Sequence, residues 1–336
     1  MKINSLKFLT AGTLGVALLA LTAATTRGEI EDKINKSFKA QPGGQLVVEV
    51  DRGSIEIKTA DNESVDIEIA RKTDANQTKA AKIFKDHVVT LTQDGSMVKV
   101  RAEYKGEKSS GWFGKGDDFS VNCLITVPRR FDVDLKTAGG SIKVAELTGK
   151  LLAQTSGGSL DFEKIEGPLS AHTSGGSITA AGCKGKADLS TSGGSLHLSD
   201  MQGDVNAHTS GGSIHADKLA GKSVLKTSGG GIEIAAIKGQ TEASTSGGSI
   251  TVHLPEQPSG DCSFNTSGGS ITVALGGKVA VDVDAHTSAG RISSDFAVAT
   301  VIQGEQKKNE LRGKINGGGP LITAHTSAGS VHLEKD

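Results

Sequence analysis

Histidines are the side chains of this 336-residue chain whose repeated placement most suggests chemistry. His172, His208, His286 and His325 each stand directly before Thr-Ser. If the repeats stack as strands about 4.8 Å apart, His172 and His208 lie two strands apart with Ser190 between them, too far to share a metal ion. We therefore interpret these four histidines as part of a solvated face.

His197 and His215 form a closer pair, because they occupy the same position of adjacent repeats. Two imidazoles on neighbouring strands could form a weak metal site. The sequence leaves open whether His197 and His215 bind a metal, and we otherwise expect no metal and no cofactor.

Catalytic patterns are missing from the recurring motif Thr-Ser-Gly-Gly-Ser. It has neither the glycine-x-serine-x-glycine order of a nucleophile elbow nor the lysine of a phosphate loop. Its turns offer no carboxylate to calcium, and the chain has no zinc signature. Asp132 and Asp134 lie two apart on an expected strand but lack the partner acids of a glycosidase. We expect no catalytic residues, no cofactor-binding residues and no enzymatic activity.

Three cysteines, Cys123, Cys183 and Cys262, are too few and too scattered for a disulfide scaffold. Cys183 and Cys262 fall at positions that other repeats fill with apolar residues, and Cys123 lies in the alternating stretch Val121–Val127. Because free cysteine packs as a small hydrophobe, we expect all three in the core.

The element that positions all these residues is a repeat marked by threonine. The spacing is 18 residues across seven threonines, widens to 21 at two more, and the motif returns after a longer gap: Thr137, Thr155, Thr173, Thr191, Thr209, Thr227, Thr245, then Thr266 and Thr287, then Thr326. Apolar and polar residues alternate on both sides of the Gly-Gly pair, which predicts two short strands per repeat.

Two strands cannot bury an apolar face alone, so successive repeats must stack. The sequence therefore predicts an all-β fold: a parallel β-solenoid (β-helix) of about ten 18-residue coils with two short strands each. The Gly-Gly pair is expected to take backbone angles that side chains forbid. Where alanine replaces the first glycine, at Ala289 and Ala328, a different turn is expected.

The chain divides into three predicted regions. Residues 1–24 have the charged start, apolar run and small residues of a signal peptide. Residues 30–130 are expected to be a β-rich cap with one helix between Asp74 and Asp86, in which Ala81, Ile83 and Phe84 face the core. Residues 131–336 are the glycine-rich solenoid, with an insertion near 297–319 whose segment 305–314 would form a charged, protective hairpin.

The formal net charge of −1 gives no reason to expect a nucleic-acid partner. No apolar segment long enough to span a membrane follows the predicted signal peptide, so the chain is expected not to be membrane-embedded. We predict an exported protein that is periplasmic, at the cell surface or secreted.

The predicted signal peptide, the stretch Arg52-Gly-Ser-Ile-Glu-Ile57 and the Thr-Ser-Gly-Gly-Ser corners carry a family resemblance. The chain resembles the bacterial putative-adhesin family of β-strand-repeat proteins of unknown function, over residues 38–333. The resemblance implies an envelope or surface protein with an adhesive or scaffolding role. It supplies no catalytic residues.

These observations favour a non-enzymatic, exported β-solenoid protein: an adhesin or envelope-binding scaffold whose repetitive flat faces bind an envelope or surface polymer or protein. One alternative is a structural envelope protein that self-associates end to end through a poorly covered edge. A polysaccharide-acting enzyme is the other alternative, disfavoured by the missing acid pair.

Overall fold

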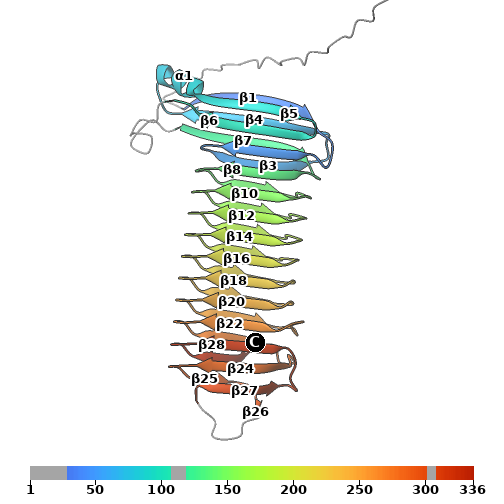
Figure 1. The fold of residues 1–336 in the computed structure, drawn as a ribbon, viewed down its shortest axis with the longest axis vertical. Coiled ribbons are helices and arrows are strands. Elements are labelled where there is room, and N and C mark those ends of the chain that lie inside the picture. The colour runs from blue at the N-terminus through green and yellow to red at the C-terminus, as the bar shows by residue number, and fades with distance from the viewer. Residues whose placement is uncertain (1–28, 107–118, 301–307) are drawn as a thin grey trace, which may run out of the picture.

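The computed structural model describes residues 29–106, 119–300 and 308–336, in which the chain forms a parallel β-solenoid (Figure 1). Strands stack along one long axis, with more irregular elements at both ends. This confirms the predicted fold class.

One face of the solenoid, the first sheet, has 14 strands. In spatial order they are β1 (Ile30–Lys39), β4 (Ser64–Thr73), β7 (Phe119–Pro128), β3 (Ser54–Ala60), β9 (Ile142–Ala145), β11 (Leu160–Glu163), β13 (Ile178–Ala181), β15 (Leu196–Ser199), β17 (Ile214–Ala216), β19 (Ile232–Ile234), β21 (Ile250–Leu254), β23 (Ile271–Leu275), β29 (Val331–Lys335) and β25 (Ile292–Ser294).

The opposite face, the second sheet, has 15 strands. From the same end they are β5 (His87–Asp94), β6 (Met97–Tyr104), β2 (Gln45–Val50), β8 (Asp132–Thr137), β10 (Leu151–Thr155), β12 (Leu169–Thr173), β14 (Ala187–Thr191), β16 (Val205–Thr209), β18 (Ser223–Thr227), β20 (Thr241–Thr245), β22 (Cys262–Thr266), β28 (Leu321–Thr326), β24 (Val281–Thr287), β27 (Glu310–Ile315) and β26 (Ala299–Thr300).

The 18-residue spacing corresponds to one turn of the solenoid in the central coils. Thr155 pairs with Thr173, and Leu189 pairs with Ala207, in parallel register one repeat apart. The same register runs through every pair of adjacent strands from β8 to β20 and from β9 to β21. Equivalent side chains therefore form continuous columns.

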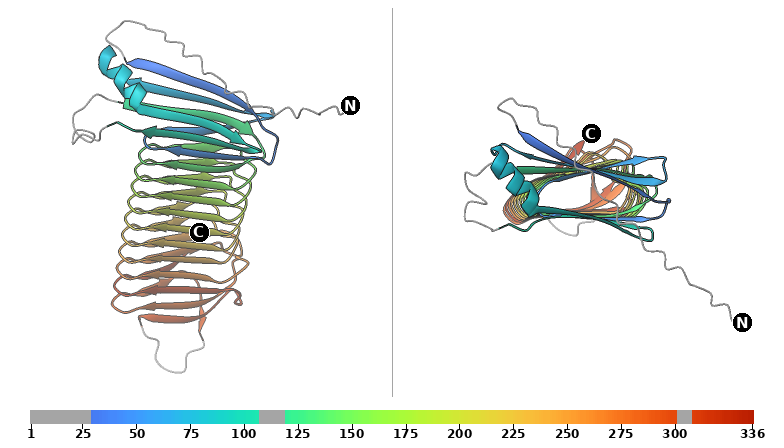
Figure 2. Two further views of the ribbon diagram at one scale, coloured as in Figure 1. Left: turned by 45° about the horizontal axis from the view of Figure 1, so that its top comes forward. Right: turned by 90° about the horizontal axis from the view of Figure 1, so that it is seen from above.

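One hydrophobic core lies between the two sheets from end to end. Each strand turns alternate residues inward, so that Leu151, Ala153 and Thr155 are buried while Gln154 is exposed. Many inward positions hold alanine or valine, which keeps the two sheets close together. Viewed along the axis, the coils have a flattened section (Figure 2).

The N-terminal end begins with a full coil. Strands β2 and β3 pair in parallel with β8 and β9, placing Leu46 beside Val133 and Ile55 beside Ile142. Beyond this coil, β7 and β6 add in parallel, and β4, β1 and β5 add antiparallel. The hairpin of β5 and β6 turns at Gly95, which has a φ of 57°.

Helix α1 (Gln77–Asp86) fulfils the prediction of one helix in this region. It begins because the Asn76 side chain accepts a hydrogen bond from the N–H of Lys79 at 3.0 Å, an N-cap. Ile83 and Phe84 are half-buried, but Ala80 is buried and Ala81 is exposed. The expectation for Ala81 was wrong by one residue, because the cap at Asn76 fixes the helix phase.

At the C-terminal end the coils are not stacked in sequence order, which corrects the expectation that Thr287 follows Thr266. The last strands of the chain, β28 and β29, insert between the coil of β22 and β23 and the coil of β24 and β25. Thr266 therefore pairs with Thr326, which in turn pairs with Thr287. Strands β27 and β26 then add antiparallel pairings outside β24.

The predicted hairpin over 305–314 lies partly outside the described residues, because its first part falls within 301–307. Its second part is β27, which covers the edge of β24. The predicted domain boundaries stay predictions, and one core runs across the boundary expected near residue 130.

Candidate binding surface

The turn Thr-Ser-Gly-Gly-Ser, called the threonine corner from here on, joins each second-sheet strand to the following first-sheet strand. In this turn Thr191 Oγ1 donates a hydrogen bond to the Gly176 carbonyl of the preceding coil at 2.8 Å and accepts one from the Gly194 N–H at 3.3 Å. The same two bonds recur in all ten corners, at Thr137, Thr155, Thr173, Thr191, Thr209, Thr227, Thr245, Thr266, Thr326 and Thr287. Threonine therefore ties one coil to the next.

The two glycines of a threonine corner have different reasons to be glycine. A Cβ on Gly194 would lie 2.0 Å from the Gly176 carbonyl oxygen, whereas one on Gly193 would lie 3.5 Å from its nearest neighbour. Neither glycine has a φ in the left-handed region. The expectation of forbidden backbone angles was wrong: the second glycine is required by the close approach of the next coil.

The corners with alanine turn like the others, which corrects the expectation for Ala289 and Ala328. Both occupy the tolerant first position, and Gly290 and Gly329 keep the crowded second position. Thr287 and Thr326 retain both of their corner hydrogen bonds. A methyl group fits at the first position because the backbone of the neighbouring coil lies only at about van der Waals distance.

The two serines of the corner also differ. The second serine is structural: Ser195 Oγ accepts a hydrogen bond from the Ser213 N–H at 3.2 Å, and equivalent bonds follow along the stack. The first serine is exposed, and within the described residues its hydroxyl has no side-chain hydrogen bond in any of nine corners: Ser156, Ser174, Ser192, Ser210, Ser228, Ser246, Ser267, Ser288 and Ser327. We name this set the outer serine column.

The histidines that precede the threonines lie on the outer face of the second sheet. His172 is exposed, and its Nδ1 lies 2.8 Å from Ser190 Oγ, the residue between it and His208. His286 and His325 are brought together by the out-of-order C-terminal coil, with ring centroids 6.1 Å apart. The sequence did not predict this second pairing.

His197 and His215 are stacked on the outer face of the first sheet. Their ring centroids lie 5.3 Å apart with an interplanar angle of 6°, and His215 Nδ1 lies 3.2 Å from Glu233 Oε2. In the part of the chain that the structure describes, no group of three or more histidine, cysteine, aspartate or glutamate side chains could hold a metal ion. Metal binding by this pair stays an open prediction.

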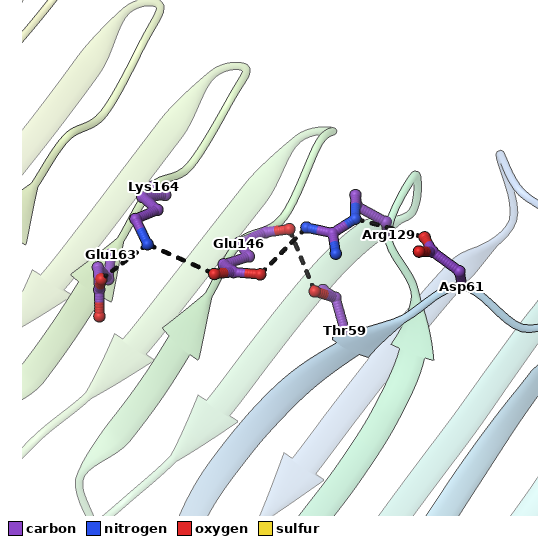
Figure 3. A network of polar contacts seen from close by, with 6 residues as sticks. All are labelled: Thr59, Asp61, Arg129, Glu146, Glu163 and Lys164. Atoms are coloured by element: carbon purple, nitrogen blue, oxygen red, sulfur yellow. Dashed lines mark hydrogen bonds and ion pairs between the residues drawn. The ribbon is translucent and has the colours of Figure 1, made fainter.

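The turns that return from the first sheet to the second carry exposed ion pairs (Figure 3). Glu146 lies between Arg129 at 3.1 Å and Lys164 at 3.4 Å, and Arg129 also reaches Asp61 at 3.5 Å. The hydrogen bonds from Arg129 and Lys164 lower the pKa of Glu146. Because these charges are exposed and satisfy one another across coils, we interpret them as support for the turn.

The N-terminal end buries a polar cluster that the sequence did not predict. The Arg71 guanidinium binds the Asp32 carboxylate, with its Nε at 2.8 Å from Oδ2, and donates to the carbonyl oxygens of Phe84 and His87. Both charged side chains are buried. The cluster therefore joins β1, β4, α1 and β5. A sequence signal existed, because Asp32 takes an inward position in alternation with Ile34.

His87 lies within this cluster and is 2% exposed. Its ring packs edge-on against Phe119 at 5.2 Å, and neither ring nitrogen has a hydrogen-bond partner among the described residues. Burial, followed by the nearby charge of Arg71, lowers the pKa of His87 to about 4, against a smaller raising effect of Asp51. The imidazole is therefore held neutral.

All three cysteines are free and buried, as expected. Burial raises the pKa of Cys123 to about 12 and that of Cys262 to about 11, and it also raises the pKa of Cys183. Because the thiolate is the reactive form, these thiols are poorly placed for chemistry.

Two grooves of similar size follow the threonine corner on the second-sheet side. The C-terminal groove, of about 430 Å³, is lined by Thr227, Ser244, Thr245, Ser246, Asn265, Thr266, Ser267, His286, Ser288, His325, Thr326 and Ser327. The N-terminal groove, of about 440 Å³, includes the charged side chains of Glu49, Asp51, Arg101, Glu103 and Lys136. The sequence predicted neither groove.

The sequence model of the family described as Toastrack DUF4097 matches residues 44–334, which is most of the chain and includes every threonine corner. The chain belongs to this toastrack family. The resemblance inferred from the corners and the alternating strands is confirmed, and no curated protein sequence matches the toastrack chain.

Solved structures similar to the toastrack chain have low sequence identity to it. A putative adhesin from Bacteroides fragilis is 14% identical with a TM-score of 0.29, covering 90% of this chain and 97% of its own. A putative lipid binding protein from Parabacteroides distasonis is 12% identical with a TM-score of 0.38 and the same coverage. A putative cell adhesion protein from Clostridium sporogenes is 12% identical with a TM-score of 0.21, covering 90% of this chain and all of its own.

Across residues 29–106, 119–300 and 308–336, no helix is long and apolar enough to span a membrane.

Proposed function

We propose that this toastrack protein is a non-enzymatic, exported binding protein, an adhesin or envelope-binding scaffold. Its ligand is a polymer or protein of the bacterial envelope or of another surface. The predicted signal peptide at residues 1–24 supports export, to the periplasm, the cell surface or the medium.

The observation that carries the proposal is the outer serine column. Thr191, Gly194 and Ser195 of one corner all have structural duties, yet the exposed hydroxyl of Ser192 has none among the described residues. The same holds for the eight other serines of the outer serine column, so the solenoid repeats an uncommitted hydroxyl along its length. Repeated weak contacts to a long ligand add through avidity.

The charges in the grooves give little support to an enzyme. Glycoside hydrolysis needs two carboxyl groups flanking the bond to be cleaved, and none of the described residues that line the C-terminal groove carries one. In the N-terminal groove, Glu49 pairs with Lys99 at 3.7 Å, and Asp51 accepts a hydrogen bond from the Tyr104 N–H at 3.1 Å. Glu49 and Asp51 are therefore engaged in contacts within the protein.

The edge strand β1 gives little support to end-to-end assembly. Asp32, Ile34, Lys36 and Phe38 alternate along one side of β1. Asp32 is buried, whereas Lys36 is exposed with its ammonium 5.5 Å from the centre of the Phe38 ring. Charges at inward positions of an edge strand oppose the addition of another strand. We therefore expect the mature protein to stay monomeric.

The experiment is a retention assay with the mature protein, residues 25–336. The protein is mixed with bacterial cells, purified peptidoglycan and insoluble surface polysaccharides, which are then sedimented and washed. We expect retention on at least one surface without release of reducing ends. No retention on any surface, or release of reducing ends, would contradict the proposal.

A further inference from the structure

We propose that the C-terminal groove binds a neutral, hydroxyl-rich sugar chain that lies along the solenoid axis. This inference rests on the proposed function, because it names the class of polymer and the place where it binds. The groove crosses five adjacent strands of the second sheet, β18, β20, β22, β28 and β24.

The groove exists because short side chains interrupt a column of long ones. Ser244 and Asn265 follow Lys226 in the outward column that precedes the threonines. Lys226 is turned aside, since its ammonium pairs with Glu242 Oε1 at 2.9 Å. His325 continues the column on the next strand. The hollow therefore lies between a lysine and a histidine, with the outer serine column along one side.

The groups facing this hollow retain hydrogen-bonding capacity. Ser246, Ser267, Ser327 and Ser288 belong to the outer serine column, and their hydroxyls are unused within the described residues. By contrast, the hydroxyl of the buried Thr266 is already committed to Gly248 and Gly269. Since a serine hydroxyl can both donate and accept, the free serines match a ligand whose own groups do both.

Among the described residues, the lining contains no lysine, arginine, aspartate or glutamate, which distinguishes this groove from the charged N-terminal groove. A strongly anionic chain would find no lysine or arginine among these described lining residues, and an apolar ligand would cover polar groups without satisfying them. A neutral polyhydroxylated chain satisfies the lining without either penalty.

The geometry suits a chain and not a single small ring. Equivalent hydroxyls recur about every 4.8 Å along the axis, the spacing of hydrogen-bonded strands. Successive sugars of an extended chain can therefore each contact a serine of a successive coil. The out-of-order coil is part of this site, because Ser327 stands between Ser267 and Ser288.

The test measures binding of cellohexaose, maltohexaose and mannohexaose by calorimetry, with hexagalacturonate as an anionic comparison. The groove variant is Ser246→Ala with Ser267→Ala. The matched control is Ser170→Ala with Thr179→Ala, which removes two exposed hydroxyls that lie outside the outer serine column and line neither groove. Thermal unfolding checks that both variants fold.

We expect at least one neutral hexasaccharide to bind, about tenfold more weakly in the groove variant and unchanged in the control. Equal weakening in both variants, no weakening in either, or binding of hexagalacturonate alone would overturn the inference. If no probe binds but the protein is retained on cells, the groove inference fails while the proposed function stands. If it is not retained either, both fail.

Discussion

The central coils and the N-terminal end share one hydrophobic core but stabilise their buried polar groups in opposite ways. In the central coils, each buried threonine makes two modest hydrogen bonds that recur in every corner. At the N-terminal end, one arginine neutralises one buried carboxylate and holds two carbonyl groups.

This difference determines how strongly a single substitution should change the stability of each region. Stability in a repeat array is approximately a sum of units and their interfaces, so loss of one corner weakens one interface. The polar cluster at the N-terminal end is not part of the repeat, so no equivalent interaction compensates for its loss. We therefore expect single substitutions there to have the larger effects.

The largest effect is expected for Arg71→Met. The substitution leaves the Asp32 carboxylate buried without its partner, which should reduce the free energy of unfolding by about 3 to 5 kcal/mol. Urea unfolding followed by circular dichroism measures it. Lys184→Gln removes an exposed ion pair of the central coils, with Glu166 at 2.8 Å, and should change little. Equal losses of unfolding free energy in the two variants would contradict the expected difference between the two regions.

Acid should weaken the N-terminal end through His87. Because folding lowers its pKa from 6.5 to about 4, its contribution to stability is complete above pH 6.5 and is lost as the pH falls toward 4. The loss should reach about 3 kcal/mol below pH 4. His87→Leu provides the control, since it cannot titrate. The stability difference between wild type and this variant, followed from pH 7.5 to 3.5, should therefore change with pH, and a constant difference would refute this role.

In the central coils, the two glycines of one corner should respond differently to alanine. Gly194→Ala forces a methyl group against the Gly176 carbonyl and should reduce the free energy of unfolding by about 2 to 3 kcal/mol. Gly193→Ala should change it by less than about 0.5 kcal/mol, since its Cβ meets only ordinary contacts. The same urea titrations decide this, and similar losses would show that backbone angles, not close approach, require the glycine pair.

The central coils were predictable because one period fixed both the strands and their register. Thr137 to Thr245 return every 18 residues, and only stacking in sequence order buries their alternating faces. At the C-terminal end the same motif predicts that a coil exists, but it does not predict which other coil that coil pairs with. The chain forms β24 and β27 before β28, yet β28 lies between β22 and β24 in the sheet. This order is determined by long-range strand pairing.

The candidate site was predictable only in part. The exposure of His172 and the burial of the cysteines follow from alternation along the strands. The C-terminal groove could not be found by alternation, because it depends on Ser267 and Ser288 being separated by Ser327. Similarly, the helix phase depended on which residue capped α1, so Ala80 and not Ala81 is buried.

The central claim is that the corner threonine holds the coils together while the serine beside it is free to bind. The corner at Thr245 and Ser246 tests this claim most directly, because both residues line the C-terminal groove. Thr245→Val keeps the shape of the side chain but leaves the Gly230 carbonyl and the Gly248 N–H without their partner. Ser246→Ala removes an exposed hydroxyl.

The measurement is the free energy of unfolding of these two variants relative to wild type. We predict a loss of about 1 to 2 kcal/mol for Thr245→Val and less than about 0.5 kcal/mol for Ser246→Ala. Equal losses would contradict the account, because the outer serine would then belong to the frame and would not be free for a ligand.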